Sequence, residues 1–256
     1  MADVRSRCGI AALLAVGVAL ALPSVPAHAR QRQVLVISET KGFRHDSIPA
    51  AVSYLERLGA HSRRYDVRHL DEGVRGLTAG RLRRTDALVF ANTSGELPLT
   101  AGQKRGLVRF VRRGGGIVGT HSASDTLHQW SGWKRLLGAE FRRHPAPALG
   151  TVHVEDRTHP ATRSLPRSFR IREEFYEFRT SPRRRAHVLA RLEPASIGGP
   201  AGADRPLVWC RREGRGRVFY DALGHFTATW RDSRQRGLVA GGLAWALGLE
   251  RAPRCG

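Results

Sequence analysis

Four histidines and a glutamate occupy positions where side chains could do chemistry. His121 directly follows the apolar, strand-like run 116–120, and His45 and His225 each lie just beyond another such run. Glu174 stands at the start of a further aromatic segment. Histidine serves as a general acid or base near neutral pH, or as a metal ligand. Histidines and a carboxylate that converge from separate loops could therefore bind a divalent metal or transfer protons on a sugar.

The spacing of these residues leaves the choice between the two chemistries open. No compact metal motif such as H-E-x-x-H occurs, so acid/base work is the preferred interpretation and a divalent metal is the alternative cofactor. His144, which precedes Pro145, is a fourth histidine in a similar position, and Ser122 adjoins His121. The nucleophile-elbow pattern G-x-S-x-G is absent. Each histidine taken alone also fits an ordinary loop or cap residue.

The elements that must position these residues are predicted from apolar periodicity. The runs 33–38, 87–91 and 116–120 are typical of buried strands. A helix is expected from residue 48 to Gly59 with Ser47 as its N-cap, and another begins at Thr100 with a capping box to Gln103. Strands joined by helices through short connections favour a mostly parallel sheet covered on both faces. Ligands of such sheets bind beyond the carboxyl ends of the strands.

The second half of the chain is richer in strands. The predicted strands are 65–70, 150–154, 174–178, 187–192, 207–211 and 217–222, and the predicted closing helix is 233–247. No linker interrupts this part, so residues 30–256 are expected to form a single α/β domain.

Residues 1–29 have the pattern of a secretory signal peptide. Arg5 and Arg7 precede an apolar run from Ile10 to Leu22, and small residues follow up to Ala29. The run is short for a bilayer span. We therefore expect export, cleavage near Ala29, and no membrane span in the mature chain; an uncleaved amino-terminal anchor is the alternative.

The strongly basic composition restricts the partners. The chain has 43 lysines and arginines against 22 acidic residues, a formal net charge of +21. The arginines are spread along the chain and no DNA-binding motif accompanies them, so specific nucleic-acid binding is not expected. A solvated, arginine-rich surface is the simplest interpretation, and nonspecific attraction to acidic polymers is the alternative.

Two cysteines remain in the expected mature chain. Cys210 lies in an apolar run and Cys255 is next to last. They could form one disulfide in an oxidising compartment or remain unpaired.

An ordered set of motifs resembles the ThuA-like (trehalose-utilisation) family, a branch of the class I glutamine amidotransferase-like fold. Together the motifs cover nearly all of the expected mature chain. They are VLVISETKGFRHDSI (34–48), GGGIVGTHSASD (114–125), the helix 133–141 with RRHP (142–145), HPAT (159–162), EEFYEF (173–178), PLVWCRREGRGRVFYDALGHF (206–226) and GLAWALG (242–248).

The resemblance implies a flavodoxin-like three-layer sandwich and an enzyme of carbohydrate metabolism, acting on a 3-keto disaccharide or glycoside. His121 stands where an amidotransferase keeps its cysteine nucleophile, so glutaminase chemistry is not expected. His121 and His225 would be acid/base groups or ligands, and Glu174 would orient one of them or bind a hydroxyl. The substrate-binding residues would be His45, His144, Ser122 and Tyr176. A non-catalytic carbohydrate-binding module is the competing hypothesis.

Overall fold

The computed structural model of this chain describes Ala2 and residues 30–255. The signal peptide expected over residues 1–29 lies outside the described residues apart from Ala2. The chain from Gln31 onward forms one unit. None of the helices in this described part combines the length and the apolar character that crossing a bilayer requires.

Nine strands form the central sheet, and two short strands pair beside it. The strands are β1 (Arg32–Ile37), β2 (Tyr65–His69), β3 (Ala87–Ala91), β4 (Gly116–Thr120), β5 (Phe141–Arg143), β6 (Ala148–Val154), β7 (Ser168–Glu173), β8 (Glu177–Phe178), β9 (His187–Glu193), β10 (Pro206–Glu213) and β11 (Gly216–Asp221). The α-helices are α1 (Ile48–Ala60), α2 (Ala79–Arg84), α3 (Ala101–Arg112), α4 (Ser131–Leu137) and α5 (Ser233–Ala246). The order of the large sheet is β2-β1-β3-β4-β11-β10-β9-β6-β7, and β5 pairs with β8.

The sheet has a parallel half and an antiparallel half. Strands β2, β1, β3, β4 and β11 pair in parallel, whereas β10, β9, β6 and β7 extend the sheet antiparallel from β11. Every residue of β3 and β4 is buried, as expected for apolar strands covered on both faces. The predicted α/β sandwich is confirmed, and its parallel character belongs to the strands that carry the loops of interest.

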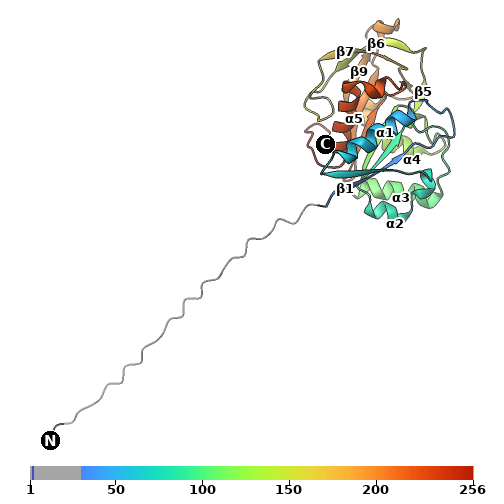
Figure 1. The fold of residues 1–256 in the computed structure, drawn as a ribbon. Coiled ribbons are helices and arrows are strands. Elements are labelled where there is room, and N and C mark those ends of the chain that lie inside the picture. The colour runs from blue at the N-terminus through green and yellow to red at the C-terminus, as the bar shows by residue number, and fades with distance from the viewer. Residues whose placement is uncertain (1, 3–29, 256) are drawn as a thin grey trace. The chain divides into compact units, whose positions relative to one another are not determined.

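Helices cover both faces of the parallel half (Figure 1). Two glycines of β4 show how closely the helices pack on the sheet. A Cβ on Gly116 would meet the Ala246 carbonyl oxygen of α5 at 2.6 Å, and one on Gly119 would meet Leu137 of α4 at 2.8 Å. Because residues three apart in a strand face opposite sides, α5 and α4 lie on opposite faces, which gives the three layers.

One expected boundary is wrong, and one expected N-cap residue lacks the capping hydrogen bond. The strand expected over 174–178 is not continuous: β7 ends at Glu173, and only 177–178 pair again, as β8. Ser47 precedes α1 but makes no side-chain cap, because its hydroxyl donates to the carbonyl of Gly224 at 2.8 Å.

The structure resolves the alternatives for the cysteines. Cys210 on β10 and Cys255 form a disulfide, with their Cα atoms 5.7 Å apart. The bond fastens the end of the described chain to the centre of the sheet.

Candidate active site and metal-ligand cluster

Four of the predicted side chains meet at the carboxyl end of the parallel strands. His45 lies between β1 and α1, His121 directly follows β4, and His225 lies in the loop after β11. Glu174 comes from the antiparallel half, directly after β7. One ligand atom from each of the four lies within 4.8 Å of the others. We call these four residues the histidine cluster.

The contacts of the histidine cluster centre on Nε2 of His121. This atom lies 3.0 Å from Nε2 of His45, 3.2 Å from Nδ1 of His225 and 3.5 Å from Oε2 of Glu174. Nδ1 of His225 is also 3.2 Å from that oxygen. His45, His121 and Glu174 are buried, and His225 is half-buried. Three imidazoles and a carboxylate therefore face one another in a largely buried space.

The hydrogen bonds of the rings fix which nitrogen carries the proton. Nδ1 of His121 lies 2.9 Å from the carbonyl oxygen of Ala222. A carbonyl oxygen only accepts, so Nδ1 donates and a neutral His121 turns the lone pair of Nε2 toward the cluster. The other nitrogen of His45, Nδ1, lies 3.3 Å from Oγ of Ser122. Ser122 thus orients His45.

The backbone at His121 is strained. Its φ of +44° lies in the left-handed region, which costs a side chain that is not glycine about 1–3 kcal/mol. Tyr220 Oη donates to the His121 carbonyl at 2.5 Å and holds this conformation. The arrangement is the sharp turn expected after β4, and it projects the imidazole instead of a nucleophilic thiol or hydroxyl.

The loop that carries His225 is fixed through the peptide group of Gly224. Three donors meet at the Gly224 carbonyl: Ser47 Oγ at 2.8 Å, Asn92 Nδ2 at 2.9 Å and Trp230 Nε1 at 3.0 Å. The φ of Gly224 is +118°, which a residue with a side chain rarely adopts. The segments before α1 and after β3 are therefore locked to the loop of His225.

Glu173 holds the same loop from the other side. It is fully buried and accepts hydrogen bonds from the backbone N–H of Gly224 at 3.2 Å and of His225 at 3.1 Å, and from the hydroxyl of Thr229. Its neighbour Glu174 points instead into the histidine cluster. The two adjacent glutamates thus have different tasks: Glu173 positions the loop and Glu174 faces the imidazoles.

The shared environment shifts the pKa values of the cluster. Burial, followed by the charges of His121 and His225, lowers the pKa of His45 to about 3, so this ring is neutral at pH 7. Burial disfavours the charged form of Glu174, but hydrogen bonds with His121 and His225 bring its pKa well below the usual value. Burial likewise opposes protonation of His225, yet Glu174 raises its pKa overall.

Asp221 is a second buried acid close to this loop. Its carboxylate accepts hydrogen bonds from the N–H of Leu223 at 3.0 Å and from Nε2 of Gln235 at 2.8 Å. Complete burial, with the charge of Glu173 nearby, raises the pKa of Asp221 to about 7. The aspartate therefore titrates near neutral pH.

His144 and Tyr176 lie beside the histidine cluster. Nδ1 of His144 is 3.2 Å from Oε1 of Glu174 and 2.9 Å from the carbonyl oxygen of Pro145, so this nitrogen carries a proton shared by two acceptors. The Tyr176 ring packs on His121 with 4.3 Å between centroids and is stacked on His144 at 5.8 Å. His144 is exposed, whereas Tyr176 is buried.

A cavity of about 480 Å³ adjoins the histidine cluster. His45 and His225 contribute to its lining, together with Phe43, Phe226 and Arg172. Phe43 is 66% exposed, and its ring meets the ring of His45 edge-on at 4.8 Å. The volume is within the range of small-molecule sites, and the lining combines aromatic faces with a few polar groups.

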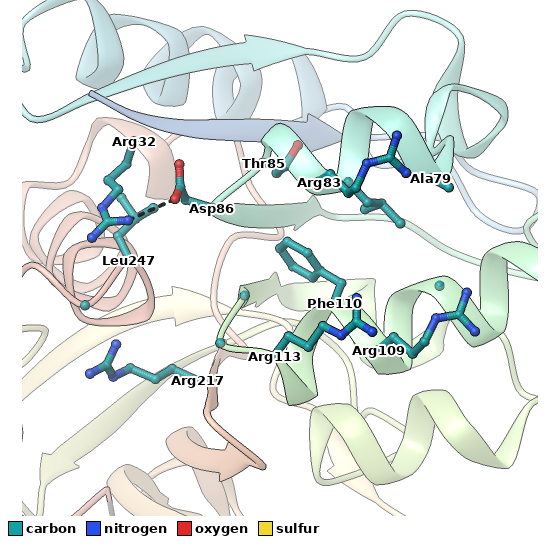
Figure 2. A pocket seen from close by; sticks show the side chains of 15 residues that line it. Arg32, Ala79, Arg83, Thr85, Asp86, Arg109, Phe110, Arg113, Arg217 and Leu247 are labelled. Atoms are coloured by element: carbon teal, nitrogen blue, oxygen red, sulfur yellow. Dashed lines mark hydrogen bonds and ion pairs between the residues drawn. The ribbon is translucent and has the colours of Figure 1, made fainter. Parts of the chain in front are cut away.

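Another cavity, of about 610 Å³, lies at the opposite edge of the sheet (Figure 2). Asp86 and Gly115, which immediately precede β3 and β4, contribute to its lining, so it opens at the amino ends of these strands. Figure 2 shows Arg83, Arg109 and Arg113 around it. This cavity is rich in arginine and has no histidine, so we place the candidate active site at the histidine cluster.

Sequence and structure comparisons give this site a family context. The family model described as ThuA, trehalose utilisation, matches residues 33–246. No curated protein sequence matches the chain.

The similar solved structures include two proteins described as ThuA-like. One, from Bacteroides uniformis ATCC 8492, has a TM-score of 0.71 and 22% identity, covering 88% of this chain and 95% of its own. The other, from Parabacteroides merdae ATCC 43184, has a TM-score of 0.69 and 18% identity, covering 88% and 94%. A protein from Thermoplasma acidophilum that is described as part of a GMP synthase has a TM-score of 0.52 and 13% identity over 87% and 97%. These likenesses show a shared fold, and the family match shows that this chain belongs to the ThuA family.

Proposed function

We propose that this protein processes a carbohydrate, such as a 3-keto disaccharide or glycoside, at the histidine cluster. The observation that carries the proposal is the convergence of His45, His121, His225 and Glu174 within 4.8 Å of one another. Their nitrogen and oxygen atoms can move protons or polarise a carbonyl or hydroxyl oxygen of a bound sugar.

The cavity beside the cluster supports a sugar as the substrate. The rings of Phe43 and Phe226 offer apolar faces on which a pyranose can stack, and Arg172 offers donors for hydroxyl or keto oxygens. A bound sugar ring would lie against His45 and His225, which line the same cavity.

The same convergence favours an enzyme over a non-catalytic binding module. A module that only holds a sugar needs stacking faces and hydrogen-bond donors. It does not need three imidazoles whose nitrogens face one another in a buried cluster, or a strained backbone at His121. Clusters of perturbed titratable groups and local strain are typical of catalytic sites.

The test is turnover of 3-keto disaccharides and 3-keto glycosides, measured by release of the free sugar. His121→Ala should abolish turnover while the circular dichroism spectrum stays that of the parent. The matched control is His153→Ala, because His153 also pairs with a glutamate, Glu193, at 3.3 Å but lies outside the cluster. Parental turnover by His121→Ala would refute the proposal.

We further propose that the protein acts after export. The basic and apolar segments before Ala29 support this, as does the disulfide between Cys210 and Cys255, because such bonds persist in oxidising compartments. Amino-terminal sequencing of the protein from its native host should give a mature chain that begins near Arg30. An intact amino terminus would refute export by cleavage.

The arginine-lined cavity supports a second candidate property, attraction to acidic polymers. Within the described part of the chain no ion pair involves the guanidinium groups of Arg83, Arg109 or Arg113. Such a surface attracts polyanions, with an affinity that falls steeply with added salt. Arg109→Ala/Arg113→Ala should weaken binding to dextran sulfate more than the control Arg184→Ala/Arg185→Ala; equal effects would leave no role for the cavity.

A further inference from the structure

We propose that the histidine cluster is a binding site for one divalent first-row transition-metal ion such as Zn²⁺. The ligand atoms would be Nε2 of His45, Nε2 of His121, Nδ1 of His225 and Oε2 of Glu174. The inference deepens the proposed function and rests on it only for the use that the ion serves. The binding site itself is argued from geometry and ligand chemistry.

The distances within the cluster fit metal coordination. Bonds of about 2.0–2.2 Å place neighbouring ligand atoms about 2.8–3.1 Å apart in octahedral coordination and about 3.3–3.6 Å apart in tetrahedral coordination. The four distances that join His121 to the other three residues, and His225 to Glu174, are 3.0, 3.2, 3.5 and 3.2 Å. All four fall in the interval that a shared ion requires.

Hydrogen bonds among the four residues satisfy the cluster less well than a bound ion would. The single lone pair on Nε2 of His121 faces the ring nitrogens of both His45 and His225, and it can accept well from only one of them. The same lone pair lies 3.5 Å from a carboxylate oxygen of Glu174, which has no proton to offer when ionised. Buried lone pairs that face one another are costly unless a cation lies between them. One ion satisfies every one of these atoms at once.

The residues around the cluster already orient its members as ligands. The carbonyl of Ala222 holds the proton of His121 on Nδ1, and Ser122 Oγ contacts Nδ1 of His45. Oε1 of Glu174, the oxygen not turned toward the cluster, is held by Nδ1 of His144. Metal-bound histidines and carboxylates in proteins usually have such partners on their remaining atoms.

The ligand types select the class of metal. Imidazole nitrogen suits Zn²⁺ and its transition-metal neighbours, whereas Mg²⁺ and Ca²⁺ prefer sites made of oxygen atoms. One carboxylate leaves a net charge of +1 on a divalent site, which favours an additional oxygen ligand from a sugar. A bound ion of this kind acts as a Lewis acid on a carbonyl or hydroxyl oxygen.

Metal binding would reassign the proton-transfer role. If Nε2 of His121 and Nδ1 of His225 are ligands, neither atom is free to shuttle protons. His144, which is exposed and 3.2 Å from the carboxylate of Glu174, then becomes the candidate acid/base group beside the ion.

The experiment measures metal content and affinity directly. The tag-free, disulfide-intact mature protein is analysed by inductively coupled plasma mass spectrometry, stripped with a chelator, and titrated with Zn²⁺, Co²⁺ and Mg²⁺ by calorimetry and by the visible spectrum of bound Co²⁺. We expect about one equivalent of Zn²⁺ or Co²⁺ and no binding of Mg²⁺. His225→Ala and Glu174→Gln should each weaken Zn²⁺ binding about 100-fold or more, since groups that merely orient a ligand are worth about 10- to 100-fold.

The controls separate this inference from the proposed function. His153→Ala, whose imidazole also pairs with a glutamate, should bind Zn²⁺ like the parent. A folded, stripped parent that fails to bind Zn²⁺, or a His225→Ala variant with parental affinity, would overturn the inference. Keto-sugar turnover that is unchanged by stripping would refute the use of the ion in turnover and leave the proposed function intact, whereas the Zn²⁺ titration alone decides the binding site. Metal binding without turnover of any keto-sugar would support the metal site and refute the proposed function.

Discussion

Glu173→Gln should loosen the loop of His225 without removing any atom of the histidine cluster. One carboxylate oxygen of Glu173 accepts from the Gly224 N–H and the Thr229 hydroxyl, and the other accepts from the His225 N–H. A glutamine keeps one oxygen and turns its NH₂ group toward the remaining donors. At least one buried donor therefore loses its acceptor.

The size of the effect follows from the hydrogen bonds that are lost. Bonds to a charged group contribute about 1.5–3 kcal/mol each, and a buried donor left without a partner costs about as much. Losing one or two of them should lower the free energy of unfolding by about 3 kcal/mol. Because the loop carries His225, the affinity for Zn²⁺ should also fall by about 10- to 100-fold.

Urea unfolding and Zn²⁺ calorimetry measure the two effects separately. The control is Glu193→Gln, since the side chain of Glu193 is 47% exposed and pairs with the partly exposed His153 at 3.3 Å. It should change stability by less than about 0.5 kcal/mol. If Glu173→Gln matched this control in both measurements, Glu173 would not be the clamp that the hydrogen bonds indicate.

Three other perturbations test the surroundings of the site. Asp221→Asn should flatten the pH dependence of stability. Folding moves the pKa of Asp221 from 3.8 to about 7, which costs stability as the pH rises from about 4 to about 7, by up to about 4 kcal/mol above pH 7. Urea midpoints that fall equally between pH 5 and pH 8 in variant and parent would contradict this prediction. Cys210→Ala/Cys255→Ala removes a crosslink between residues 45 apart and should lower the free energy of unfolding by about 4 kcal/mol, seen as a Tm lower by about 10 °C. A Tm equal to that of the parent would show that the bond does not restrict the unfolded chain. His144→Ala should lower kcat at least about 100-fold while the Zn²⁺ affinity falls no more than about 10-fold, because His144 pairs with Glu174 and is not itself a proposed ligand. A variant in which kcat and the Zn²⁺ affinity fall by the same factor would instead make His144 a part of the metal site.

Much of the site could be predicted because parallel strands end at one edge of a sheet. The apolar runs before His45, His121 and His225 are buried strands, and residues that follow such strands must lie near one another. His121 was identifiable from the single sharp turn after β4. Local pattern was enough for these features because it determines both the strand and its end.

The remaining features depend on contacts that no local pattern encodes. His144 and Tyr176 reach the cluster through the pairing of β5 and β8, strands of three and two residues that are too short for a periodic signal. Phe169 and Ile171 alternate with arginines in β7, and this apolar alternation could have moved the predicted strand to its true place.

The hydrogen bonds that Ser47 and Asn92 donate to the Gly224 carbonyl were missed for the same reason. Ser47 and Asn92 carry ordinary capping or turn side chains, and sequence alone assigns them those local roles. Their hydroxyl and amide instead reach a carbonyl more than 130 residues away along the chain. Only the closed fold shows that these residues support the loop of His225.

The disulfide between Cys210 and Cys255 also keeps two sulfur donors from binding metal ions. A ring nitrogen of His159 lies within 4.8 Å of the two sulfur atoms, and the buried Nε2 of this ring has no hydrogen-bond partner among the described residues. While the bond is closed, the sulfurs are not thiolates and this trio cannot bind zinc. Reduction would release two thiols next to an imidazole whose Nδ1 already accepts from the Ala161 N–H, so this trio offers fewer ligands than the four of a structural zinc site. Zinc titrations of the histidine cluster therefore need the bond intact, because the free thiols of a reduced chain would compete for the ion.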